Sequence, residues 1–288
     1  MIKNPEALKM FAHVYMFVLG AVVGSFLNVC IARLPHRKSL VRPHSHCPKC
    51  DAPIRWYDNI PLISFIILRA KCRNCGSPIS WQYPMVELLT AILFVILMRR
   101  FTNVVALMIY AAFTSSLIVI SFIDLKHYII PDQISLPGIP IGLAVSFLPA
   151  HLAGGQLVSG SFLDSLIGCI VGGGTLYLVA RFSLIAFKKE GMGGGDIKLL
   201  AMVGAFLGWK FTLMTIIVGS VLGAAVGVTL ILLRFKTRSE YIPFGPYLAI
   251  GALLSLLSGD RLLLMYLEFG QALNDFMLRL FGTGGGMQ

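Results

Sequence analysis

The stretch "GMGGGDIKLLAMVGAFLGW" (residues 191–209) runs from four glycines through Asp196 into an apolar segment. That segment is long enough to enter a lipid bilayer. A glycine-rich phosphate loop is disfavoured, because no Gly-Lys-Ser/Thr ending follows and no βα unit precedes it. The stretch therefore predicts a carboxylate delivered by a loop to the edge of a membrane.

The composition of the whole chain supports a membrane protein. Of its 288 residues, 57% are hydrophobic and only 13% are charged, whereas soluble domains are about 25% charged. The formal charge of +11 suits either nucleic acid or the positive-inside bias of a membrane protein, and we favour the latter. We expect no nucleic-acid partner. Residues 11–32 lack a small-residue cleavage site and are expected to be a retained span.

The apolar segments predict an all-α, polytopic fold with about eight transmembrane helices, each of about 20 residues or somewhat fewer. The expected spans are residues 11–32, 84–98, 104–123, 137–150, 162–187, 197–209, 211–233 and 244–259. No internal repeat is apparent.

The basic residues predict the orientation of these spans. Residues 33–83 hold nine of the 24 lysines and arginines, so this loop is expected in the cytoplasm. If successive spans alternate in direction from this loop, sixteen basic residues lie inside and seven outside, and both termini lie outside. The pair Arg99-Arg100 lies on the outer side and is an exception that this topology leaves unexplained.

These patterns divide the chain into four predicted parts. Residues 1–32 form an N-terminal transmembrane segment, 33–83 a cytoplasmic loop, 84–259 the main membrane domain, and 260–288 an interfacial amphipathic helix with a flexible tail.

Two aspartates lie at the ends of predicted spans. Asp124 closes the third span and Asp196 opens the sixth, so both are expected at the cytoplasmic membrane face. Carboxylates at this depth are costly and usually have a partner or a task. Two facing carboxylates can share one proton, which is the aspartic-protease arrangement: the ionised acid takes a proton from water while the protonated one polarises the scissile carbonyl.

Other roles for these aspartates stay open. Asp196 could simply cap its helix, and Asp124 could pair with Lys126 or Lys198. An ion-coupled transporter would also use paired intramembrane carboxylates. A non-enzymatic assembly factor would depend on the basic loop instead. Asp132 follows a proline, and we attribute it to the start of the next helix.

The glycines before Asp196 have two expected roles. They permit backbone conformations that residues with a Cβ disfavour. They also leave room for an extended substrate backbone beside the acid.

Four of the six cysteines form two C-x2-C pairs, Cys47/Cys50 and Cys72/Cys75, separated by 21 residues. This spacing predicts a structural zinc site, since two such pairs supply four thiolates for a tetrahedral ion. Disulfides or a redox C-x2-C are the competing interpretations, and a reducing cytoplasm disfavours them.

Four blocks of the chain together resemble the type IV prepilin peptidase family. They are "GSFLNVCIARLP", the loop from "SHCPKC" to "YPMVELLT", "FIDLKHYIIPDQISLP", and "GGGDIKLLAMVGAFLGW", which contains the GxGD motif. In one departure, Ala70 stands where "LRGKC"-like members have glycine.

The resemblance implies an aspartic endopeptidase of the bacterial inner membrane, with its active site at the cytoplasmic face. Such enzymes remove the basic leader from type IV prepilins and type II secretion pseudopilins, after a glycine. The catalytic acids carried over by position are Asp124 and Asp196. Many members also methylate the new N-terminus with S-adenosylmethionine, an activity linked to the large cytoplasmic loop; no residues for this donor are assigned.

Overall fold

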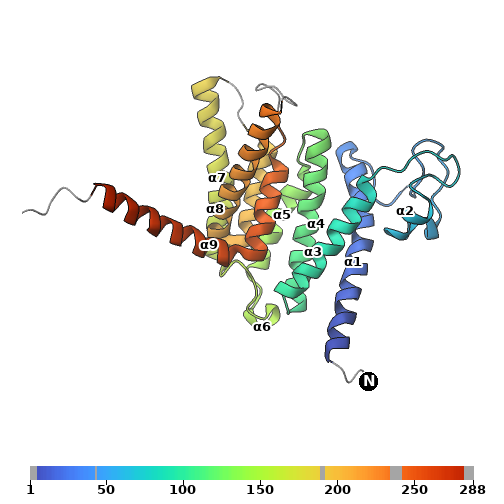
Figure 1. Cartoon of the computed structure of the whole chain (residues 1–288), viewed down its shortest axis with the longest axis horizontal. Coiled ribbons are helices and arrows are strands. Elements are labelled where there is room, and N and C mark those ends of the chain that lie inside the picture. Colours follow the sequence, from blue (N-terminus) through green and yellow to red (C-terminus); the bar gives the residue numbers. More distant parts are fainter. Residues whose placement is uncertain (1–4, 43, 189–191, 234–241, 282–288) are drawn as a thin grey trace, which may run out of the picture.

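The computed structural model describes residues 5–42, 44–188, 192–233 and 242–281. In this part of the chain the fold is all-helical, with two isolated β-bridges and no strand, which confirms the predicted class. Figure 1 shows a layer of long helices, with the cysteine-containing loop beside one end of α1 and the N-terminus at the other.

The helices follow one another along the chain with short connections. Their bounds are α1 Pro5–Arg33, η1 Leu34–His36, η2 Trp56–Asn59, α2 Ile63–Ile67, α3 Gln82–Arg100, α4 Val104–His127, α5 Asp132–Val145, α6 Ala150–Ala153, α7 Phe162–Phe187, α8 Gly194–Leu232 and α9 Gly245–Phe281.

Six of the described helices (α1, α3, α4, α7, α8 and α9) are long and apolar enough to cross a membrane by length and composition. The predicted count of about eight is therefore not confirmed. Helix α5 has 14 residues and begins at Asp132 rather than at residue 137, because Pro131 is its N-cap. The predicted spans 197–209 and 211–233 both lie in α8.

Helix α8 reverses direction at Gly208. This residue has φ 77° and ψ 172°, outside the helical region. A Cβ built at Gly172 of α7 would lie 2.4 Å from the Leu200 carbonyl oxygen and 3.1 Å from Thr212 Cγ2. A straight helix would separate residues 200 and 212 by about 18 Å. The two halves of α8 therefore form a helical hairpin, and Gly208 supplies a backbone conformation that favours glycine.

Glycines bring the helix backbones into close contact. A Cβ at Gly20 or at Gly24 of α1 would lie 2.7 Å from a Cα atom of α3. A Cβ at Gly168 of α7 would lie 2.4 Å from the carbonyl oxygen of Gly204 in α8. Small residues spaced four apart let transmembrane helices approach in this way, because lipid provides no hydrophobic drive for their association.

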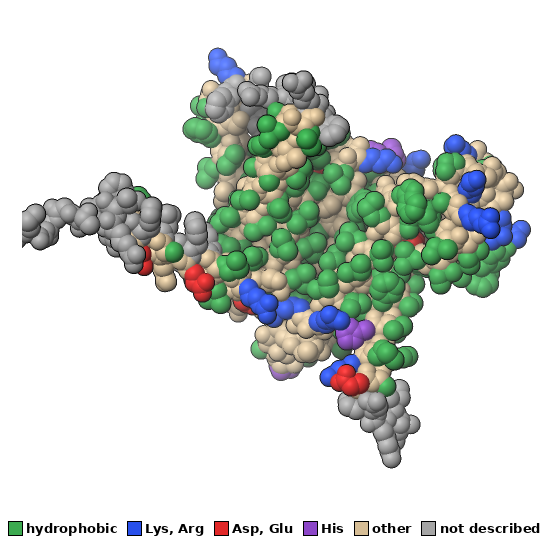
Figure 2. Space-filling view, viewed as in Figure 1, with side chains coloured by type: hydrophobic (Ala, Val, Ile, Leu, Met, Phe, Trp, Pro, Cys, Tyr) green, Lys and Arg blue, Asp and Glu red, His purple; other side chains and the backbone are tan. Residues whose placement is uncertain are grey.

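Charged side chains lie mainly at the ends of the helical layer and over the cysteine loop, while hydrophobic side chains cover its middle (Figure 2). At the end opposite the loop, Arg100 forms an ion pair of 2.9 Å with Asp260, and Arg99 Nε donates to His13 at 3.2 Å. These contacts give both arginines a partner, and their place on the outer side stays an exception to the charge count.

The C-terminal helix bends at Ser258, whose φ of −136° is not helical. Beyond this bend, α9 leaves the layer and extends away from it (Figure 1). Its interfacial position stays a prediction. The expected flexible tail (282–288) lies outside the described residues, as do the basic residues Lys3, Lys189, Arg234, Lys236 and Arg238.

Gly168→Ala is expected to destabilise the fold, whereas Gly174→Ala on the same helix is expected to be tolerated. The new Cβ at residue 168 would meet the α8 backbone, while nothing lies within 4 Å of the Cβ position at residue 174. Overpacking costs about 1–3 kcal/mol. Unfolding of both variants in detergent measures the difference, and equal stabilities would contradict the close packing of α7 on α8.

Candidate active site and metal centre

The structure brings Asp124 and Asp196 together from different helices. Asp124 lies in the last turn of α4 and Asp196 in the first turn of α8. Each is 3% exposed, and the two carboxyl groups lie within electrostatic reach of one another. Buried carboxyl groups so close together are uncommon unless they share a proton or serve a reaction.

The start of α9 completes this site. The backbone N–H of Gly245 donates to Asp124 Oδ2 at 3.0 Å. Ile130, in the connection from α4 to α5, contacts the backbone beside both acids: a Cβ at Gly195 would lie 2.8 Å from Ile130 Cβ, and one at Gly245 3.3 Å from Ile130 Cδ1. The ends of α4, α8 and α9 are therefore packed around one side chain.

Asp196 retains unused hydrogen-bonding capacity. Its Oδ1 is buried and has no hydrogen-bond partner in the described part of the chain. Buried polar atoms normally have partners, so an orphaned carboxylate oxygen points to a water or substrate group that completes it.

The interpretations of Asp196 as a helix cap and of Asp124 as the ion-pair partner of a lysine are wrong. The N-cap of α8 is Gly193, not Asp196. Lys198 pairs with Asp132 at 2.7 Å, and Asp124 has a backbone donor instead of a lysine. Asp132 is the first residue of α5, as predicted.

The described glycines directly before Asp196 (193–195) do not adopt the unusual backbone conformations that were predicted, and Gly191 lies outside the described residues. Gly193 has φ −72° and ψ 141°, which any residue can adopt, and neither Gly194 nor Gly195 has a positive φ. Packing distinguishes them instead. Gly195 is pressed against Ile130, whereas nothing lies within 4 Å of a Cβ at Gly194. Close approach is therefore the reason for glycine at residue 195.

The four cysteines of the loop form one cluster. The sulfur atoms of Cys47, Cys50, Cys72 and Cys75 lie within 4.8 Å of one another, and Cys47 and Cys75 are 3.8 Å apart. A tetrahedral zinc with Zn–S bonds of about 2.3 Å would set its sulfurs about 3.8 Å apart. The cluster can hold a metal ion of this kind.

Hydrogen bonds favour the thiolate form of Cys47 and Cys75, whereas desolvation and the neighbouring thiols Cys75 and Cys47 raise the pKa of Cys50. The backbone N–H groups of Lys49 and Cys50 lower the pKa of Cys47 to about 6. The hydroxyl of Ser77, 3.2 Å from Cys75 Sγ, lowers the pKa of Cys75 below its ordinary value. Thiolates are the form in which cysteine binds metals. All four cysteines are free of disulfides.

The two knuckles are copies of one motif, a repeat that sequence analysis missed. Residues 47–56 and 72–81 both read C-x2-C-x2-P-I-x-W, at an offset of 25 residues. The two copies also fold alike: an isolated β-bridge joins His46 to Pro53 in the first, and one joins Lys71 to Pro78 at the equivalent positions of the second. A self-comparison of this loop at short offsets would have revealed the repeat.

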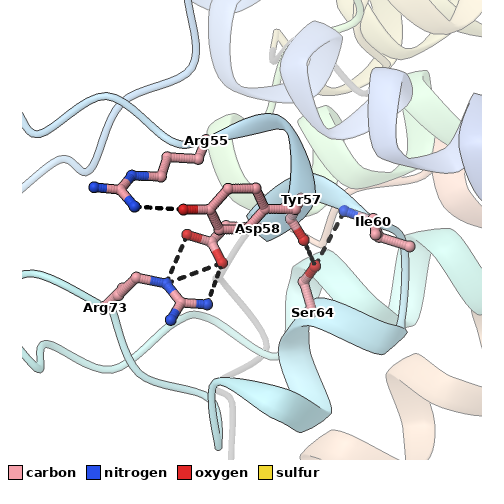
Figure 3. A network of polar contacts seen from close by, with 6 residues as sticks. All are labelled: Arg55, Tyr57, Asp58, Ile60, Ser64 and Arg73. Carbon is pink, nitrogen blue, oxygen red and sulfur yellow. Dashed lines mark hydrogen bonds and ion pairs between the residues drawn. The ribbon is translucent and has the colours of Figure 1, made fainter.

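A polar network fastens the second knuckle to the rest of the loop (Figure 3). Arg73, between two cysteines of the cluster, makes a bidentate ion pair with Asp58 of η2, with contacts of 2.6–3.1 Å. This pair lowers the pKa of Asp58. Ser64 continues the network by donating to the Tyr57 carbonyl at 2.9 Å and accepting from Ile60 N–H at 3.0 Å.

The departure at Ala70 falls at a position with a left-handed backbone. Ala70 has φ 58°, next to Arg69 with φ 50°. Glycine adopts this conformation without steric cost, which explains its expected place here. The strain lies within the cysteine loop, two residues before Cys72.

Glu87 is a buried acid that sequence analysis passed over. It lies in α3, is 7% exposed, and its Oε2 accepts the N–H of Leu62 from the loop at 2.8 Å. The signal was available, because Glu87 is the one acidic residue within the predicted span 84–98. Intramembrane carboxylates indicate function by default.

Comparisons with known proteins identify the family of the chain. The model of the bacterial peptidase A24 N-terminal domain matches residues 18–101, and that of the type IV leader peptidase family matches residues 111–228. The chain is 40% identical over 282 residues to a prepilin leader peptidase/N-methyltransferase of Aeromonas salmonicida, covering 88% of this chain and 93% of that protein. The chain belongs to the type IV leader peptidase family.

Further relatives carry the same description. A protein of Myxococcus xanthus is 43% identical over 219 residues, an alignment that covers 76% of this chain and 63% of the relative. One of Pseudomonas aeruginosa is 38% identical, with coverages of 88% and 92%. No solved structure matches the chain significantly.

Asp58→Ala and Arg73→Ala are each expected to weaken metal binding by the cysteine cluster, roughly tenfold. Either change frees the second knuckle from η2, so the double variant should be no weaker than the single ones. Competition with a chelator measures the affinity. Lys49→Ala is the control, since Lys49 lies within the first knuckle and forms no ion pair in the described part of the chain. Additive losses would contradict the coupling.

Proposed function

We propose that this protein is an aspartic endopeptidase that removes the basic leader from type IV prepilins or type II secretion pseudopilins after a glycine. The observation that carries the proposal is the meeting of two buried carboxyl groups, Asp124 and Asp196, beside the glycine-containing start of α8. The family of the chain and the names of its relatives support the same activity.

In this mechanism one aspartate is ionised and the other protonated. The ionised acid takes a proton from a water molecule, which attacks the carbonyl carbon of the leader glycine while the protonated acid donates to the carbonyl oxygen. Collapse of the intermediate breaks the C–N bond: the acid that took the proton from water gives it to the departing nitrogen, and the other acid takes a hydroxyl proton back, leaving a carboxyl group on the leader and an amine on the pilin. The free oxygen of Asp196 and the open side of Gly194 support access of water and of an extended backbone.

The enzyme acts in the bacterial inner membrane, with its site at the cytoplasmic face. The nine basic residues of the 33–83 loop and its free thiols support a cytoplasmic position for that loop. Lys126, two residues beyond Asp124, lines a cleft together with this loop, so the loop and the acids share one side of the membrane.

The proposed protein has the four parts that the sequence predicted. Residues 1–32 form an N-terminal transmembrane segment, 33–83 the cytoplasmic metal-binding loop and 84–259 the transmembrane peptidase domain, and α9 beyond residue 260 is the interfacial helix. The first family match, 18–101, ends directly after α3, and the second, 111–228, begins within α4. The cysteine loop and the two aspartates therefore fall in different matches, although the first match also contains α3, which this division assigns to the peptidase.

The second activity is methylation of the new N-terminal amine, with S-adenosylmethionine as donor. The N-methyltransferase in the names of the relatives supports this activity. The rival interpretation as an ion-coupled transporter has no support from the family or from the relatives.

Asp124→Asn and Asp196→Asn are each expected to lower leader cleavage about a thousandfold or more, since either removes an acid–base partner. Cleavage of a prepilin-like peptide by the detergent-purified protein, followed by mass spectrometry, measures the effect. Asp132→Asn is the control, because Asp132 is exposed and pairs with Lys198. Substantial cleavage by either aspartate variant would falsify the two-acid mechanism.

Gly195→Ala is expected to reduce cleavage strongly, while Gly194→Ala should retain most of it. The Cβ of residue 195 would push Ile130 away from the acids, and that of residue 194 meets no atom. The same cleavage assay compares the two neighbouring variants. Equal losses of cleavage in the two variants would contradict packing against Ile130 as the reason for glycine at residue 195.

The metal of the cysteine cluster is zinc, which cross-links the two knuckles of the loop. Purified protein should contain about one zinc per chain, and replacement of Cys47 and Cys72 by serine should remove it. Elemental analysis measures the content. A metal-free wild type, prepared without chelators, would refute the zinc site while leaving the peptidase untouched.

A further inference from the structure

The cysteine loop exposes a cluster of large apolar side chains around its short helix α2. Three isoleucines of this helix, Ile63, Ile66 and Ile67, are exposed, and so is Trp81 at the start of α3. Exposed apolar patches mark sites of interaction with proteins or membranes. Neither the proposed peptidase chemistry nor the metal centre uses these side chains.

Helix α2 turns its apolar face outward. Ile63, Ile66 and Ile67 stand three and four residues apart, so they share one face of the helix. Ser64 is buried instead, and its hydroxyl donates to the Tyr57 carbonyl at 2.9 Å (Figure 3). A helix surrounded by water shows the reverse arrangement, with isoleucine buried and serine exposed. Whatever covers this face of α2 is therefore apolar.

The three isoleucines point away from the helices behind the loop. The other side of α2, with Phe65 and Leu68, lines a cleft between the loop and helices α1, α3 and α4. None of the three isoleucines lines that cleft, and Ile66 is 74% exposed. In the part of the chain that the structure describes, their face of α2 therefore lies open.

The exposed face of α2 continues onto the outer face of α3. The ring of Trp81 makes an edge-on contact with Phe65, with 4.9 Å between the ring centroids. Trp81 is the N-cap of α3, which is long and apolar enough to cross a membrane. Met85, Leu88 and Ile92 follow at helical spacing and are exposed. Lipid that surrounds this face of α3 therefore reaches α2 as well.

The charges of the loop also suit a membrane surface. Residues 33–83 hold nine lysines and arginines but only two acidic residues, and Arg69 and Lys71 follow α2 directly. Figure 2 shows hydrophobic side chains along the lower edge of the loop, toward the N-terminal end of α1, with basic side chains above and beyond them. Basic residues beside an apolar face are typical of segments that lie in the membrane interface.

We propose that α2 and Trp81 hold the cysteine loop in the bilayer surface, at the leaflet that surrounds the C-terminal end of α1. The isoleucines insert among the headgroups and upper acyl chains, and the indole of Trp81 lies at the interface. This inference goes beyond the proposed peptidase and does not depend on its chemistry. The loop rests on the membrane instead of standing in the water above it.

Tryptophan fluorescence tests this position, because the chain has only three tryptophans. In the full-length protein, Trp56, Trp81 and Trp209 are replaced by phenylalanine. Ile66→Trp then places a single reporter on α2, and the protein is reconstituted into bilayers. Lipids with brominated acyl chains should quench this reporter strongly, while iodide in the water should quench it weakly. A protein that keeps only Trp81 is the positive control, since this residue begins a membrane helix.

A double substitution in the reporter protein, Ile63→Asp with Ile67→Asp, provides the second measurement. Carboxylates resist the apolar part of the bilayer, so quenching by brominated lipid should fall at least twofold and quenching by iodide should rise. The zinc content should stay unchanged, because both isoleucines are exposed within the fold. Lys49→Asp is the matched control: it changes the charge of the loop by the same amount outside α2 and should leave the quenching nearly unchanged.

A third measurement needs no substitution. Lipids that carry a photoreactive acyl chain should cross-link to residues 63–67 of the wild type, as located by mass spectrometry. This experiment decides the proposal even if the reporter protein does not fold.

Several outcomes would overturn the proposal. A reporter quenched by iodide but not by brominated lipid would place α2 in water. A reporter shielded from both would mean that protein covers α2, and a dimeric mass would identify a second copy of the chain. Absence of lipid cross-links from α2 would count equally against it. Leader cleavage is independent of these results, so a failure of the peptidase proposal leaves the membrane position of the loop standing, and the reverse also holds.

Discussion

Close backbone contact between helices is the constraint on which this structure depends. Lipid offers no hydrophobic reward for bringing apolar helices together, so their association relies on dispersion contacts at short range. Glycines at the contacts of α1 with α3 and of α7 with α8 make such contacts possible. The same device operates at the site, where Gly195 and Gly245 allow Ile130 to bring the ends of α8 and α9 beside α4. The helical layer and the candidate active site therefore depend on the same kind of close glycine contact.

The loop and the membrane helices form a connected system. The cysteine cluster fixes two copies of a knuckle, the pair Asp58–Arg73 links one knuckle to η2, and Leu62 reaches down to Glu87 in α3. The last of these links gives the buried Glu87 carboxylate a donor without which it would be costly to bury, whereas Arg73 is half exposed. This chain of contacts supports a cleft that opens beside Lys126, on the same helix as Asp124. The cleft and the two aspartates therefore lie at the same end of the helical layer.

Much of the candidate site could be predicted from local patterns. The spacing of four cysteines predicted their cluster, and the positions of Asp124 and Asp196 at the ends of apolar segments predicted their proximity. Errors arose where the answer depended on contacts between distant segments. Backbone freedom was invoked for Gly195, although its packing against Ile130 decides the residue. Glu87 was overlooked although it is the one acidic residue of its predicted span, and only the tertiary structure shows that Leu62, 25 residues away, donates to it.

The sequence by itself determined the helical class, the membrane environment and the chemistry of the thiolates, because hydrophobic composition, segment length and residue type act locally. It also determined the family, since the motifs stand in a recognisable order. Tertiary structure alone decided that α8 folds back at Gly208, that Gly245 donates to Asp124, and that a cleft forms under the cysteine loop. These features arise from close contacts between segments far apart in the chain, and such contacts leave no periodic pattern in the sequence.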